Sequence, residues 1–107
     1  MPMTVTYWER RDNADRDSFA KAALNVCRAS RSRPGIRSSR FYWLNNDNLV
    51  LQTEVDSLDI FNGPPPPEVA KALFALSDQA RTIRMERWVD AGQGEQTYRQ
   101  AQQAPQR

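Results

Sequence analysis

Two stripes of apolar residues at helical spacing, each set between short strand-like runs, constrain the fold of this chain more than any other feature. Apolar residues recur at helical intervals over residues 16–32 and again over residues 67–80, which predicts two amphipathic helices. The runs beside them are rich in β-branched and aromatic residues, which favour strands. The predicted strands cover residues 4–10, 36–44, 49–55 and 81–89.

Residues with known cap and turn preferences mark the ends of these elements. Asp15 is one of several Asp and Asn residues before the first helix, where such side chains accept hydrogen bonds from free backbone amides. Pro34 and Gly35 end that helix, and Pro67 suits the first position of the second helix, where no amide donor is needed. The polar run 45–48 predicts a hairpin turn between the second and third strands.

The order strand, helix, strand occurs twice in series, and right-handed crossovers fold two such halves into one sheet. We therefore predict an α+β, ferredoxin-like domain over residues 1–90, with four antiparallel strands in the spatial order 4-1-3-2 and both helices on one face. Residues 91–107 are rich in glutamine and nearly free of apolar side chains, so we expect a polar C-terminal tail there.

The composition excludes several classes of site. The 107 residues include no histidine and one cysteine, Cys27, which removes histidine-based catalysis, histidine-ligated haem, a disulfide framework and multi-cysteine metal sites. Cys27 falls on the apolar face of the first helix, and we expect a buried core thiol. We therefore expect no metal and no cofactor.

The chain has no apolar stretch long enough for a signal peptide or a membrane span, which predicts a cytoplasmic protein without a membrane partner.

Alternation along the strands predicts which side chains the helices leave uncovered. Leu49 and Leu51 are expected beneath the helices, so Val50, Gln52 and Glu54 face away. By the same alternation the helix side takes Val5, Tyr7, Ile83 and Met85. The open side takes Thr6, Trp8, Tyr42, Thr82, Arg84, Glu86 and Trp88. Exposed indoles form an apolar patch that the same face of a second copy would cover, so we expect a homodimer.

Four segments match a known pattern: RPGI (33–36), RFYW (40–43), LVLQTEVDS (49–57) and the proline-rich loop before the second helix. Through these segments the chain resembles, over about residues 3–90, the dimeric α/β-barrel superfamily, which includes the antibiotic-biosynthesis-monooxygenase-like proteins. It implies two sheets that pair into a closed barrel, with a ligand pocket between sheet and helices or inside the barrel. It also implies that cofactor-independent oxygenation belongs among the candidate activities.

Three charged side chains of the predicted open face are candidates for catalysis. Glu54 and Glu86 are candidate general bases, and Arg84 is the candidate to stabilise an enolate. An interfacial ion pair between neighbouring strands would also account for the same residues. The candidate ligand-binding residues combine rings that stack on flat ligands with groups that hydrogen-bond a carbonyl: Thr6, Trp8, Tyr42, Gln52 and Trp88. The rings would also suit the core of a dimer interface.

Three functions are compatible with these features. The first is a small dimeric protein that binds a hydrophobic or aromatic metabolite, with cofactor-independent monooxygenation as the activity that the resemblance implies. The second is a non-enzymatic structural or regulatory dimer. The third is an RNA-binding module, because RNA-recognition motifs share this element order. The strand at 49–55 lacks aromatic residues that would stack on bases, and the net charge is only +2, so we expect no nucleic-acid partner.

Overall fold

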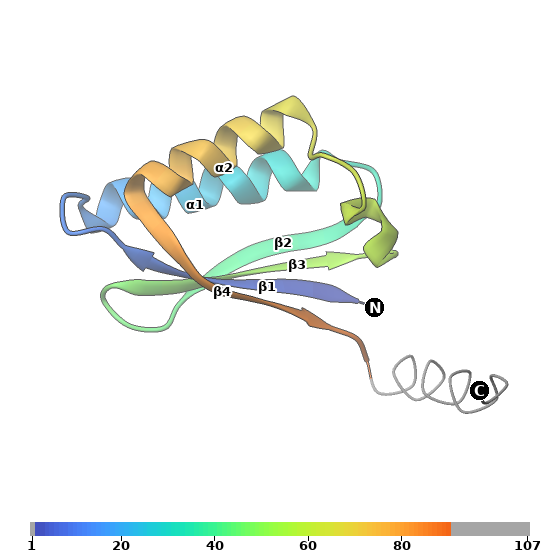
Figure 1. The fold of residues 1–107 in the computed structure, drawn as a ribbon, viewed down its shortest axis with the longest axis horizontal. Coiled ribbons are helices and arrows are strands. Elements are labelled where there is room, and N and C mark those ends of the chain that lie inside the picture. The colour runs from blue at the N-terminus through green and yellow to red at the C-terminus, as the bar shows by residue number, and fades with distance from the viewer. Residues whose placement is uncertain (1, 91–107) are drawn as a thin grey trace, which may run out of the picture.

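The computed structural model describes residues 2–90 and confirms the predicted fold class. Its elements are β1 (Met3–Arg10), α1 (Arg16–Arg31), β2 (Ile36–Trp43), β3 (Asn48–Val55), the 3-10 helix η1 (Leu58–Phe61), α2 (Pro67–Gln79) and β4 (Ala80–Trp88). The sheet has the predicted order β2-β3-β1-β4, and each neighbouring pair is antiparallel. Both helices lie on one face of this sheet (Figure 1). The polar tail predicted over residues 91–107 lies outside the described residues.

The predicted helix boundaries form as expected. The Asp15 carboxylate caps α1 by accepting a hydrogen bond of 2.7 Å from the backbone amide of Ser18, and this bond lowers the pKa of the Asp15 carboxyl. Pro67 is the first residue of α2. Gly35, between α1 and β2, has a φ of +90°, which a β-carbon would strain, so the turn requires glycine. Of the helices in residues 2–90, none is long and apolar enough to cross a membrane.

One hydrophobic core fills the space between the helices and the sheet. Its buried members are Trp8, Phe19, Ala22, Ala23, Val26, Cys27, Leu49, Leu51, Leu76 and Ala80. Trp43 of β2 packs against this core, with its ring edge-on to Phe19 at a centroid distance of 5.5 Å. Cys27 is fully buried, as predicted, and burial raises the pKa of its thiol.

The two faces of β1 are opposite to the prediction. Trp8 is only 6% exposed and belongs to the core beneath the helices, and Thr6 lies on the same side. The Tyr7 hydroxyl instead donates to Glu86 on the open face, where Val5 also lies. Both faces of this strand carry β-branched and aromatic residues, Thr4, Thr6 and Trp8 on one and Val5 and Tyr7 on the other, so the alternation alone does not reveal the core face.

A β-bulge in β4 explains a second difference from the prediction. Arg84 lies opposite Tyr7 but Thr82 lies opposite Trp8, so Ile83 has no partner on β1. Because of this additional residue, Thr82 faces the helices instead of the open side. Ile83, expected beneath the helices, is 51% exposed. The open face does carry Arg84, Glu86 and Trp88 as predicted, and Met85 lies on the helix side.

Candidate functional site

A cavity of about 400 Å³ lies between the helices and the helix-facing side of the sheet. This volume is within the range of pockets that hold small organic ligands. Most of its lining is apolar, from both the sheet and the helix layer: Trp8, Val26, Leu51, Phe61, Pro65, Val69, Leu73 and Met85 are among its residues. The candidate site therefore lies on the covered face of the sheet, whereas sequence analysis placed the ligand-binding residues on the open face.

The strand register gives the floor of this cavity a polar end and an apolar end. At the end where β1 begins, one row across three strands consists of Thr4, Thr53 and Arg87. The next row consists of Thr6, Leu51 and Met85. Trp8 follows at the far end of the floor. A ligand in the cavity would therefore meet hydroxyl and guanidinium groups at one end and an indole at the other.

Trp8 and Thr6, two of the predicted ligand-binding residues, are joined within the cavity wall. The Trp8 Nε1 group donates a hydrogen bond of 3.0 Å to Thr6 Oγ1. This bond satisfies the one polar atom of the indole, so the rest of the ring is free to contact an apolar ligand.

Arg33 and Ser30 bring polar groups to the cavity from the helix layer. Because α1 runs back across the sheet, its C-terminal end lies near the start of β1 and beside η1 (Figure 1). Arg33 follows this end, and its Nη2 donates a hydrogen bond of 2.6 Å to the carbonyl of Ile60 in η1. The bond anchors the guanidinium group at the polar end of the cavity.

On the opposite face of the sheet, Glu86 is the centre of a polar cluster. Its Oε1 accepts hydrogen bonds from the Tyr7 hydroxyl at 2.9 Å and from Trp88 Nε1 at 3.2 Å, and its Oε2 lies 3.3 Å from Arg84 Nε. The Arg84 guanidinium also lies over the Tyr7 ring, 4.1 Å from the centroid. Tyr7 and then Glu86 raise the pKa of Arg84, which stays fully charged. The structure thus brings together Arg84, Glu86 and Trp88 of the predicted site.

Glu54 does not join this cluster. It lies on β3 opposite Met3 of the central strand, so two strand spacings, roughly 10 Å, separate its backbone from that of β4. Gln52 lies one row away on β3, and Tyr42 is 46% exposed on β2. The predicted catalytic set is therefore divided, and none of its members lines the cavity: Glu54, Arg84 and Glu86 all face the open side.

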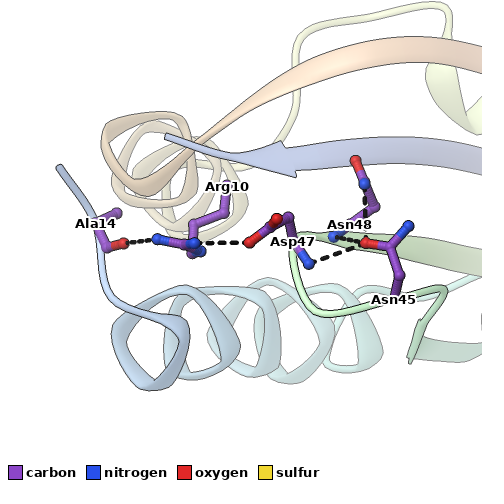
Figure 2. A network of polar contacts seen from close by, with 5 residues as sticks. All are labelled: Arg10, Ala14, Asn45, Asp47 and Asn48. Carbon is purple, nitrogen blue, oxygen red and sulfur yellow. Dashed lines mark hydrogen bonds and ion pairs between the residues drawn. The ribbon is translucent and has the colours of Figure 1, made fainter. Parts of the chain in front are cut away.

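A second depression, of about 640 Å³, lies where β1 ends, and its lining is strongly polar. Figure 2 shows that Arg10 joins two neighbouring segments here: it donates to the Ala14 carbonyl at 2.5 Å and to Asp47 Oδ1 at 2.6 Å. Arg81 pairs with Glu9 in the same depression. Because these charged groups already bond one another, we assign them to holding the end of β1 against the hairpin turn.

Comparison with solved structures identifies the fold. No protein-family model matches the chain, and neither does any curated protein sequence. SnoaB, a cofactor-independent oxygenase from Streptomyces nogalater, superposes with a TM-score of 0.72 at 11% identity, covering 83% of this chain and 91% of that one. The chain has the ferredoxin-like fold of this oxygenase. A proposed antibiotic biosynthesis monooxygenase from Nitrosomonas europaea gives 0.70 at 13% identity, with 85% and 99% covered. HapK from Hahella chejuensis gives 0.73 at 16%, with 86% and 94% covered.

Sequence analysis missed most of the residues that line the cavity. Arg33 appeared only as the first residue of the segment RPGI (33–36), and Arg87 was not singled out. Once Trp8 is known to face the helices, the two-residue period of a strand places Thr4 and Thr6 on the same face of β1. Among residues 2–90 no cluster of three or more acidic or cysteine side chains is arranged to hold a metal ion. No acidic side chain is among the described residues that line the cavity.

Proposed function

We propose that this protein binds a hydrophobic, aromatic metabolite in the cavity between the sheet and the helices. The observation that carries this proposal is the mainly apolar lining of a space of about 400 Å³, with the Trp8 indole at one end. An aromatic ligand stacked on an aromatic side chain gains roughly 0.5–1.5 kcal/mol beyond the burial of its area. The match to the fold of SnoaB, which is a cofactor-independent oxygenase, supports a monooxygenase activity on such a ligand.

The proposed reaction uses the substrate and O₂ as its redox partners. The substrate carries an acidic CH₂ group next to an aromatic carbonyl, and it loses one C–H proton to solvent to give a resonance-stabilised carbanion. The carbanion reduces O₂: one oxygen atom becomes a new carbonyl at that carbon, and the other leaves as water with the two hydrogens. The cavity contributes binding and stabilisation of the anion by Arg33 and Arg87. The base role predicted for Glu54 and Glu86 does not apply to a ligand bound there.

We also propose that the open face of the sheet pairs with the same face of a second copy. Tyr42 and Trp88 are 46% and 45% exposed on this face, which leaves aromatic surface for a partner to cover. An isologous dimer would place the Glu86 cluster of each copy near the interface. A non-enzymatic dimer, the second candidate function, predicts the same assembly without oxygen consumption.

Two adjacent residues of α2 give a matched test of the cavity. Leu73 lines the cavity, whereas Phe74 is 75% exposed. Leu73→Trp should fill the cavity and abolish both binding of the neutral dye N-phenyl-1-naphthylamine and oxygen consumption with aromatic ketones that have an acidic CH₂ group. Phe74→Trp should retain both. Equal binding by the two variants would contradict the cavity as the site, and dye binding without oxygen consumption for any such ketone would favour the non-enzymatic dimer.

A further inference from the structure

Two guanidinium groups line the cavity, and no carboxylate lies with them. Arg33 follows α1 and Arg87 belongs to β4, and both contribute to the lining. None of the ion pairs within residues 2–90 involves either arginine. Among the described residues, the lining therefore carries two positive charges and no acidic side chain.

Hydroxyl groups accompany these charges at the same end of the cavity. Thr4 and Thr53 lie in one row with Arg87 across the three strands. The Thr53 hydroxyl is hydrogen-bonded to Ser39 at 3.0 Å, while the Thr4 hydroxyl has no hydrogen-bond partner within residues 2–90. Thr4 is therefore available to donate to a bound oxygen atom.

The helix dipoles do not cancel this positive charge. The C-terminal end of α1 and the N-terminal end of α2 both lie at this end of the sheet (Figure 1). Their partial charges are opposite in sign and of similar size, so they offset one another. The two arginines are then the charged side chains that the cavity lining itself contributes at this end.

We infer that the ligand is amphipathic and carries an anionic oxygen, as in a carboxylate or an ionised phenol, which binds Arg33 and Arg87 while its aromatic body extends toward Trp8. Guanidinium groups bind such oxygens through paired, charge-assisted hydrogen bonds. The inference rests on the proposed function, because it takes the cavity as the ligand site, and it adds the charge and orientation of the ligand.

Two dyes with the same aromatic ring system separate the claim that the cavity binds a ligand from the claim that this ligand is anionic. 1-Anilinonaphthalene-8-sulfonate is anionic, and N-phenyl-1-naphthylamine is its neutral counterpart. We expect the anion to bind at least tenfold more tightly, and we expect Arg33→Gln and Arg87→Gln each to weaken its binding about tenfold. Both variants should leave the affinity of the neutral dye within about twofold. Arg28→Gln, at an exposed position of α1, removes the same charge outside the cavity and is the matched control.

Each outcome bears on one claim. Equal affinities for the two dyes in the wild-type protein, or equal losses in Arg28→Gln and the cavity variants, would overturn the anion inference and leave the cavity as the site. Absence of binding by both dyes, or binding that survives Leu73→Trp, would overturn the proposed site itself. Arg33 also anchors η1, so Arg33→Lys, which keeps the charge, should retain most of the anion affinity if the charge is what matters. Arg87→Gln tests the same point without disturbing that anchor.

Discussion

The Trp8 indole donates a hydrogen bond of 3.0 Å to the Thr6 hydroxyl, two residues away on the same face of β1. Thr6 is the one acceptor that the described part of the chain offers this N–H group. The indole is 6% exposed, so a missing acceptor would leave the N–H poorly solvated beneath the helices. The pair therefore lets a large aromatic ring form the end of an apolar cavity without an unsatisfied polar atom.

Thr6→Val tests this relationship. Valine keeps the shape of threonine and removes the acceptor, so we expect the free energy of unfolding to fall by about 1–3 kcal/mol, as measured by urea denaturation. The same substitution in a Trp8→Phe background should cost much less, because the N–H group is already absent. A loss of equal size in both backgrounds would show that the hydrogen bond does not stabilise the protein.

Cys27 predicts a specific pH dependence of stability. Burial raises the pKa of the Cys27 thiol in the folded state, whereas a thiol in the unfolded chain ionises at about pH 8.5. Above that pH the unfolded chain binds fewer protons than the folded one, so the free energy of unfolding should decline as the pH rises toward the folded pKa. Urea unfolding at several pH values from neutral upward should show this component in the wild-type protein and not in Cys27→Ala. Parallel profiles for the two proteins would contradict it.

The open face predicts how the protein assembles. We expect light scattering to give a mass near twice the 12.3 kDa of one chain. Tyr42→Glu should convert this species to a monomer, because it places a charge in the proposed apolar interface. Phe74→Glu changes an exposed aromatic residue on the helix layer and should remain dimeric. A dimer disrupted by Phe74→Glu and not by Tyr42→Glu would move the interface to the helices.

Local signals in the sequence were sufficient for the architecture. Asp15 and Pro67 have side chains that favour helix starts wherever they occur, and the structure uses both in that way. The order of the elements then leaves few topologies for the sheet, and the structure has the predicted one.

The faces of the strands depended on information that local patterns do not carry. Trp8 and Tyr7 are both aromatic, so the pattern of β1 alone does not show which of them joins the core, and the structure places Trp8 there. The bulge at Ile83 places Thr82 on the helix side instead of the predicted open side. The sequence of β4 contains no glycine or turn residue that would predict a bulge. Arg33 and Arg87 line one cavity although they are far apart in the sequence, so only the assembled fold reveals them as part of one site.

The central claim is that the cavity beside Trp8 binds an aromatic ligand, and Trp8 fluorescence tests it most directly. In a Trp43→Phe, Trp88→Phe protein, Trp8 is the remaining tryptophan, because the chain has three. Titration with N-phenyl-1-naphthylamine should quench Trp8 emission by energy transfer and raise dye emission in parallel, with saturation at one dye per chain. Dye binding that leaves Trp8 emission unchanged, or no saturable binding, would contradict the account.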